Sequence, residues 1–482
     1  MREALKNVIC PSCGGPPLLA HQQLQNSLQA LKEENKMVST LLNKYTGKVI
    51  SGDNVPMPLV GVNGIERAAM CKTAAAAMDE LVRLLRTNEP LWVKSRPDGR
   101  YVIHRENYVK SFPTASKLPS STARIESSKD SALVTMNAAR LVSMFLDADK
   151  WVDLFPTIVT EAKTIQVVET GMVNGCLQLI TWVEHVAVDD KTPTHRLYQD
   201  LILGGSAYGS DRWLISLQRM CERFSISSNA EITEPINHIG TTCSREGWKW
   251  KSNIMKVSHR MVKSFCSMLN MPGQLDFPQR SDETNSGVRV SVRHTTGRGQ
   301  TKGITVTAAT SLWLPLPSQS VFSLLKDPKI RHQWDVLCNG NPINEMANIS
   351  TGSVPGNCIS IIQPFVPSEN NMMLLQECFC NSDCLEGMVV YAPISFAAMN
   401  TAMNGDDCSD IPILPSGFIV SADTGVPAIS SASILTVAFQ ILLSSPSSST
   451  QELNIQSVAT VNNLVTSTVQ RLKVLLNCSD LN

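Results

Sequence analysis

The sequence predicts an α+β protein, in which antiparallel sheets pack against long amphipathic helices and a short coiled coil precedes them. Three observations support this prediction. Short strand-like segments follow one another through residues 288–443, and an amphipathic helix closes the chain at 457–475. A shorter succession of strand, helix and strand occupies residues 124–188, followed by another amphipathic helix. We therefore expect two domains of one architecture in tandem, each with a sheet and a long C-terminal helix.

Composition limits the classes of function. The 482 residues suffice for two or three domains, and Lys plus Arg equals Asp plus Glu at 42 each. Nucleic-acid binders usually carry a basic excess, so these residues do not by themselves indicate DNA binding. The longest apolar stretch, at 434–443, is too short to span a bilayer. The start of the chain has no apolar run typical of a signal peptide, so we expect an intracellular protein with reduced cysteines.

The first element, residues 1–50, contains a helix with a narrow apolar seam. Its members recur at the a and d positions of a heptad: Leu24, Leu28, Leu31, Val38 and Leu42. So narrow a stripe needs a partner helix, and Asn35 within it helps to fix the register. The pattern favours a dimeric coiled coil; the alternative is a helix packed on its own domain.

Two cysteines, Cys10 and Cys13, stand ahead of this seam in CPSCGGPP. A structural zinc needs four ligands, and the other tight cysteine group, at 378–384, is far away and in a strand-rich region. We therefore expect no metal and no obligatory cofactor. Two hypotheses remain: a reversible disulfide within or between chains, or a loop with two inert thiols.

The next elements lead into the first domain, residues 66–230. A Pro- and Gly-rich linker at 51–65 precedes an Ala-rich helix with Met70 and Met78 on its apolar face. A later strand places Trp182 beside Ile180 and Glu184 on one face. The closing helix carries the apolar stripe Leu214, Leu217, Cys221 and Phe224. Such a stripe is more typical of plain core than of a ligand contact.

The remaining elements form a connecting helix and linker at 231–285 and the second domain at 286–482. Strands are predicted at 288–294 and 304–314, with GRGQTKG as the hairpin turn between them. Cys378 and Cys380 alternate along a later strand and point the same way, as a small buried pair.

Two segments resemble enzyme motifs, but each lacks a residue that its motif requires. GGSAYG has Tyr208 where a nucleophile elbow needs glycine, and GRGQTKG lacks the ending of a phosphate-binding loop. The eight histidines are scattered. We predict that the protein is not an enzyme.

Several segments resemble one known family. MREALKNVICPSCGGPP with the leucine seam is similar to the zipper-loop-zipper of plant class IV homeodomain-leucine zipper transcription factors. AAAMDELVRLL, ENYVKSFP, WLPLPSQSVFSLLKDP, YAPIS and LPSGF resemble the START domain and the START-adjacent region of that family. The resemblance runs from residue 1 to about 475, without the homeodomain.

The resemblance implies a fold and a function. It implies a helix-grip START domain, whose sheet curls around the long C-terminal helix and holds a lipid. Candidate lipid contacts are then Trp182, Leu214, Leu217, Cys221 and Phe224. It further implies transcription regulation in the nucleus, redox-sensitive dimerisation through Cys10 and Cys13, and homo- or heterodimers with related proteins. DNA would be contacted only by a full-length form or a partner.

The first domain departs from the family near residue 179. Only 30 residues lie between Trp151 and Trp182, where the family has several more strands. We therefore expect an internally shortened START domain. Two alternative functions remain open: a stand-alone lipid- or sterol-binding START module, and a dominant-negative dimerisation partner of full-length relatives.

Overall fold

The structure is a computed structural model. The chain divides into two compact units, residues 1–61 and 62–482. The structure describes these residues, all of them in the second unit: 64–95, 100–112, 124–165, 179–188, 208–228, 247–269, 288–295, 299–338, 340–364, 372–381, 386–423, 432–443 and 450–478. The predicted seam and Cys10 and Cys13 lie outside the described residues.

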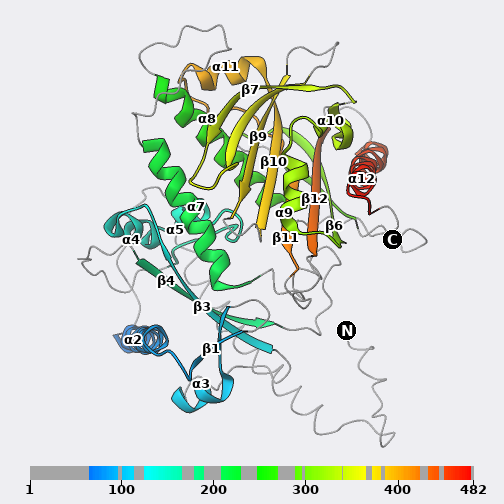
Figure 1. Cartoon of the computed structure of the whole chain (residues 1–482). Coiled ribbons are helices and arrows are strands. Elements are labelled where there is room, and N and C mark those ends of the chain that lie inside the picture. The colour runs from blue at the N-terminus through cyan, green and yellow to red at the C-terminus, as the bar shows by residue number, and fades with distance from the viewer. Residues whose placement is uncertain are drawn as a thin grey trace, which may run out of the picture. The chain divides into compact units, whose positions relative to one another are not determined.

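An eight-stranded antiparallel sheet organises the second half of the chain (Figure 1). Its strands lie in the order β5-β6-β12-β11-β10-β9-β8-β7. Their bounds are β5 Arg289–Thr295, β6 Gly303–Leu314, β7 Ile343–Ser350, β8 Cys358–Pro364, β9 Met372–Cys380, β10 Glu386–Ser395, β11 Ser416–Ala422 and β12 Ser433–Leu443.

Helices cover both faces of this sheet. Side chains alternate along a strand, so on β10 Val389 and Tyr391 enter one apolar core while Met388 and Val390 enter another. The core with Val389 contains residues of α9 (Ser318–Lys326), α10 (Arg331–Trp334) and α12 (Thr450–Leu475). The core with Val390 contains residues of α8 (Gly247–Leu269) and α11 (Phe396–Met403).

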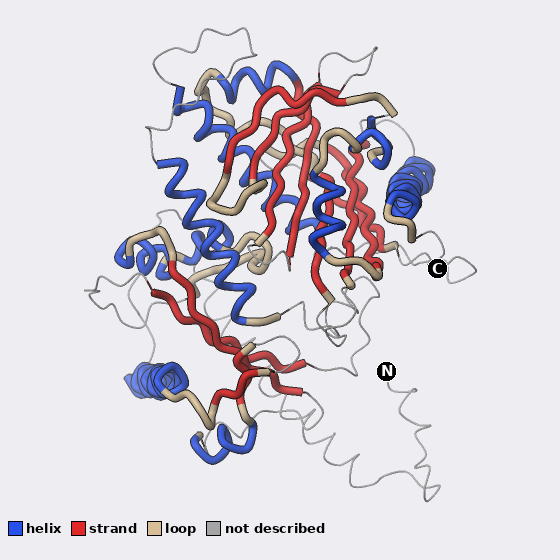
Figure 2. The backbone as a smooth tube through the Cα atoms, in the orientation of Figure 1, coloured by secondary structure: helices blue, strands red, loops and turns tan. Residues whose placement is uncertain are grey.

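The chain order of these elements is that of a helix grip. After β6 come α9 and α10, then a short 3-10 turn η2 (Val336–Cys338) and the meander β7 to β12, and finally α12. β12 returns to pair with β6, from Ser433 opposite Leu314 to Leu443 opposite Ile304. The amphipathic helix predicted at 457–475 is confirmed, because Val461, Val465 and Leu472 on one side of α12 are buried beside β6 and β12. Figure 2 shows the mixture of helix and antiparallel strand that the sequence predicted.

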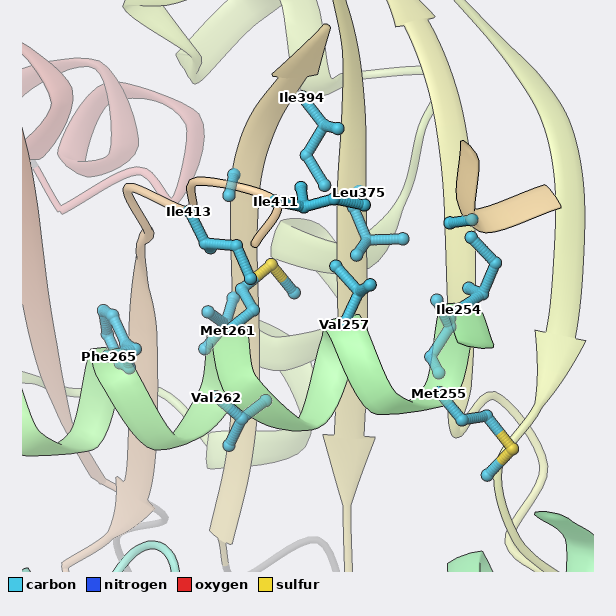
Figure 3. Packing of buried hydrophobic residues seen from close by; sticks show 14 of the residues in the cluster. Ile254, Met255, Val257, Met261, Val262, Phe265, Leu375, Ile394, Ile411 and Ile413 are labelled. Atoms are coloured by element: carbon cyan, nitrogen blue, oxygen red, sulfur yellow. The ribbon is translucent and has the colours of Figure 1, made fainter. Parts of the chain in front are cut away.

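The helix α8, expected in the connecting segment, packs on the second sheet. Figure 3 shows its apolar side chains, Val257 and Met261 among them, beside Leu375, Ile394 and Ile411. Val257 and Met261 are buried almost completely. The core on this face of the second sheet therefore includes residues from Trp250 onward.

The first half contains a smaller sheet of four antiparallel strands in the order β1-β2-β3-β4. The strands are β1 Trp92–Lys94, β2 Tyr101–Ile103, β3 Arg124–Leu133 and β4 Leu179–Val188. The helices are α2 Gly64–Arg86, α3 Arg105–Ser111, α4 Ala138–Leu146, α5 Ala148–Leu154 and α7 Ser210–Ser228. The expected apolar face of α2 is exposed at Met70 and Met78, and the helix buries Leu84 instead.

The two halves share one plan, and the first half is shorter. β3-α4-α5-β4-α7 follows the order of β6-α9-α10-β12-α12, and β3 pairs with β4 along ten residues as β6 pairs with β12. Between α10 and β12 the chain has 98 residues (335–432), which hold the strands β7 to β11. Between α5 and β4 it has only 24 residues (155–178). Five strands of seven to ten residues need 41, so this interval is too short for their equivalents.

Two features are absent from the part of the chain that the structure describes. None of the described helices has the length and apolar character needed to cross a membrane. No group of three metal-ligating side chains is assembled among the same residues.

Candidate lipid-binding site

The candidate lipid contacts gather where α7 lies against β3 and β4. N-cap residues begin the two neighbouring helices, α4 and α5. Asn137 Oδ1 accepts from the Arg140 backbone N–H at 2.8 Å and begins α4, and Asp147 Oδ1 accepts from the Asp149 N–H at 3.1 Å and begins α5. This tight corner brings Phe145 and Trp151 together above the sheet.

Five aromatic rings fill the space between these elements. They are Phe145, Trp151, Phe155, Trp182 and Trp213. The rings of Trp182 and Trp213 stack with centroids 4.9 Å apart, and Phe155 meets them at 5.5 and 5.0 Å. Such distances are typical of aromatic pairs in direct contact. The five rings therefore form one contiguous cluster in direct contact.

A half-buried carboxylate orients this cluster. Glu184 Oε1 accepts from Trp213 Nε1 at 2.8 Å, and its Oε2 accepts from the backbone N–H of Gly209 at 2.5 Å. Gly209 has φ of +134° just before α7, and a Cβ there would lie 2.4 Å from Asp211 Oδ1. Glu184 thus fixes both the start of α7 and the ring of Trp213.

The structure brings most of the predicted lipid contacts together. Leu217 and Cys221 are buried in one apolar cluster, and Trp182 and Phe224 pack against it half-buried. Leu214 is also buried, with 1 % of its surface exposed. Burial raises the pKa of the Cys221 thiol to about 11, as expected of an inert core cysteine.

Sequence reasoning missed Trp213 and Phe155. Trp213 lies one turn before Leu217 on the same face of α7, so the helical period already placed it on the predicted stripe. Phe155 follows α5 directly and is fully buried.

The opposite face of α7 carries a buried charge cluster that the sequence did not predict. Arg219 Nη2 donates to Glu377 Oε1 at 2.5 Å, and Arg223 Nη1 donates to the same oxygen. Ser258 Oγ of α8 donates to Glu377 Oε2 at 2.5 Å. Glu377 lies on β9 and has no exposed surface, and Arg219 also stacks over the ring of Phe379. This cluster links α7 of the first half to β9 and α8 of the second.

The electrostatics of the cluster keep the carboxylate charged. Burial alone would raise the pKa of Glu377, but the charges of Arg223 and Arg219 and the hydrogen bond from Ser258 outweigh it and hold the pKa at about 2. Two guanidinium groups face one carboxylate, so the charge of Glu377 is essential to their burial.

A second, half-exposed contact joins the same halves. Asp153 of α5 lies 3.3 Å from Lys263 Nζ and 3.4 Å from His259 Nε2, both on α8. The hydrogen bond with His259 and the charge of Lys263 lower the pKa of Asp153 to about 2 against the effect of burial. α5 and α7, which frame the aromatic cluster, are therefore both fastened to α8.

The predicted pair Cys378 and Cys380 is confirmed as buried. Both side chains enter the same core, with 2 % and 4 % of their surface exposed.

The chain matches two family models. The START domain model matches residues 72–180, and the model described as "PDF2-like, C-terminal domain" matches residues 248–478. The first match ends at the start of β4, where the sequence predicted a shortened domain. The second begins with α8, in agreement with the packing of that helix.

Curated plant proteins align with the whole chain. "Homeobox-leucine zipper protein HDG8" of Arabidopsis thaliana is 34% identical over 608 residues, covering 100% of this chain and 85% of its own length. "Homeobox-leucine zipper protein ROC8" of Oryza sativa subsp. japonica is 36% identical over 623 residues, covering 99% and 86%. Since the first alignment has 608 positions and the chain 482 residues, 126 positions hold no residue of this chain.

Among solved structures, human STARD10 matches 45% of this chain and 78% of its own at 12% identity. The TM-score of 0.26 is too low to compare the two arrangements in detail.

Proposed function

Because the chain belongs to the plant homeobox-leucine zipper family, in the class IV branch that carries a START domain, we propose that it regulates transcription as a dimer-forming member of that family. The observation that carries this proposal is the alignment with homeobox-leucine zipper proteins along the full 482 residues. The START and PDF2-like matches follow in that order along the chain. A catalytic role is not part of the proposal, since its named relatives are homeobox-leucine zipper proteins.

Dimerisation is assigned to the predicted seam, from Leu24 to Leu42. Leucines at heptad spacing need a partner helix, and a related zipper supplies one. The proposed partners are a second copy of this chain or a related homeobox-leucine zipper protein. DNA is then contacted through the homeodomain of a full-length form, in the nucleus.

The contacts among the described residues support a regulatory module in which the START half and the C-terminal half act as one rigid body. Arg219 and Arg223 on the closing helix of the START half meet Glu377 in the C-terminal half, away from water. A change at the aromatic cluster on one face of α7 would reach the C-terminal sheet through the other face. We assign α7 the role of that link.

Lipid binding is the narrower part of the proposal. The interval at 155–178 is too short for strands equivalent to β7–β11, and aromatic rings occupy the space beside Trp182 and Leu217. A lipid must therefore displace some of these rings to reach the five candidate contacts. We propose that this chain binds lipid more weakly than a START domain of full length, and native mass spectrometry of the purified chain tests this by its yield of co-purified lipid.

A reporter assay tests the regulatory function. A full-length family member is expressed in plant cells with a reporter carrying its binding sequence, alone or with this chain. We expect this chain to change reporter output, and Leu28→Glu in the seam to abolish the change because a charge enters the dimer interface. Exposed Glu66→Gln is the matched control and should behave as the wild type. An unchanged reporter with nuclear, folded chain would overturn the proposal.

A further inference from the structure

Two cysteines face each other across neighbouring strands of the second sheet. Cys358 begins β8 and is the register partner of Cys378 on β9. Directly opposed residues of antiparallel strands have Cα atoms about 4.5–5.5 Å apart. Disulfide-bonded cysteines have Cα atoms about 4.4–6.8 Å apart. The backbone therefore already places this pair at bonding distance.

The two side chains also point to the same face. Cys378 enters the core that holds Val389 and Tyr391, and Cys358 packs against that core. Each thiol shifts the pKa of the other, as expected of neighbouring side chains. Cys358 is half-buried, whereas Cys378 has 2 % of its surface exposed. A reagent from solution thus meets Cys358 first, and Cys378 lies beside it on the neighbouring strand.

The environment activates one thiol of the pair. The hydrogen bond from Cys378, aided by Asn348 and Ser360, lowers the pKa of Cys358 to about 6 against the effect of burial. The same hydrogen bond and burial raise the pKa of Cys378 well above its ordinary value. Among the described cysteines with a shifted pKa, only Cys358 has a lowered value. Burial raises the pKa of Cys266 and of Cys338 to about 12. The lowered pKa favours the thiolate of Cys358, the form that attacks disulfides.

We propose that Cys358 and Cys378 are an oxidative modification site, where a small disulfide such as oxidised glutathione converts the two thiols into a cross-strand disulfide. Cys358 Sγ attacks one sulfur of the oxidant, forms a mixed disulfide and releases one glutathione thiolate. Cys378 then transfers its proton to a thiolate, attacks Cys358 Sγ and releases the second glutathione. The two protein thiols are oxidised, and one glutathione disulfide is reduced to two thiols.

Oxidation of the two cysteines would change hydrogen bonds inside the C-terminal domain. Gln376 Nε2 donates to Cys378 Sγ at 3.3 Å, and Gln376 Oε1 accepts from Arg331. Arg331 Nε, at the start of α10, in turn donates to Asp335 Oδ2 at its end, at 2.8 Å. Oxidation makes Cys378 Sγ a weaker acceptor for Gln376, and so reaches the buried Arg331–Asp335 pair. This site is separate from Cys10 and Cys13 and does not depend on the proposed function.

Mass mapping of the whole chain tests the proposal. The reduced chain is incubated with oxidised glutathione, alkylated and digested without reductant. We expect one cross-linked peptide pair joining Cys358 to Cys378, the loss of both residues from the alkylated pool, and recovery of both after dithiothreitol. Cysteine pairs elsewhere are separated by peptide mass.

Three variants test which cysteine reacts at each step of the thiol–disulfide exchange. Cys378→Ala should stop at a mixed disulfide on Cys358, and Cys358→Ala should leave Cys378 free. Cys380→Ala, which removes a buried thiol on the same strand, should cross-link as the wild type does. Free Cys358 and Cys378 in the oxidised wild type, or a stable glutathione adduct on Cys358 with Cys378 still free, would overturn the proposal. The wild-type map decides this even if a variant fails to fold.

Discussion

Arg219 Nη2 on α7 donates to Glu377 Oε1 on β9 at 2.5 Å, although the two residues are 158 positions apart in the sequence. The carboxylate has no exposed surface, and Ser258 on α8 binds its second oxygen at 2.5 Å. The closing helix of the first half is therefore held by the core of the second.

The first prediction concerns removal of the buried charge. Glu377→Gln leaves Arg219 and Arg223 buried without a counter-charge, and breaking a buried pair on one side costs about 3–5 kcal/mol. We expect the free energy of unfolding, measured with urea, to fall by that order. The exposed control Glu66→Gln should stay within about 0.5 kcal/mol of the wild type. Equal stability of Glu377→Gln and the control would contradict the assigned role of the cluster.

The second prediction follows from the pKa of Glu377. Its folded-state pKa of about 2 lies below the ordinary 4.5, so its contribution is present above pH 4.5 and is lost as pH falls towards 2. A shift of this size corresponds to roughly 3 kcal/mol at neutral pH. Urea unfolding between pH 6 and 3 should show stability falling with acid. Glu377→Gln should have a shallower slope, and an identical slope in both proteins would refute the prediction.

The third prediction separates packing from hydrogen bonding at the aromatic cluster. Trp213→Ala removes a ring stacked on Trp182 and should lower stability by about 3–5 kcal/mol. Trp213→Phe keeps a ring but loses the hydrogen bond to Glu184, which costs about 1.5–3 kcal/mol for a charged acceptor. Denaturant curves followed by circular dichroism give both values. Equal losses in the two variants would contradict a contribution of the ring stacking beyond that of the hydrogen bond.

The fourth prediction concerns the reactivity of Cys358. With a pKa of about 6, its alkylation by iodoacetamide should reach half its maximal rate near pH 6, well below the ordinary 9. Cys378→Ala removes the hydrogen bond that lowers the pKa most, so the midpoint should move upwards. Cys380→Ala should leave it unchanged. A wild-type midpoint near pH 9 would show that Cys378 does not activate Cys358.

Much of the second half could be predicted because its strands alternate and its closing helix has a regular stripe. Strands expected at 288–294 and 304–314 are observed at 289–295 and 303–314. β7 was missed because it is an edge strand, and its segment INEMANIS is largely exposed and polar. β7 is a strand because it pairs with β8, and no local sequence pattern predicts that pairing.

The site was only partly predictable. The helical period placed Leu217 and Cys221 on one face of α7, and the structure confirms that they share a core. The same period puts Arg219 and Arg223 one turn apart on another face, but their partner Glu377 lies far along the chain. Such a pairing is a tertiary contact, which sequence spacing cannot identify. The contacts of Cys358 and Cys378 depend on strand register in the same way.

We propose that this chain acts by pairing with a homeobox-leucine zipper protein through its N-terminal seam. Sedimentation of the purified chain mixed with a full-length family member, labelled with a separate dye, tests it most directly. We predict a heterodimer for the wild type and for Glu66→Gln, and separate species for Leu28→Glu. If wild type and Leu28→Glu sediment alike, either both paired or both alone, dimerisation through this seam is contradicted.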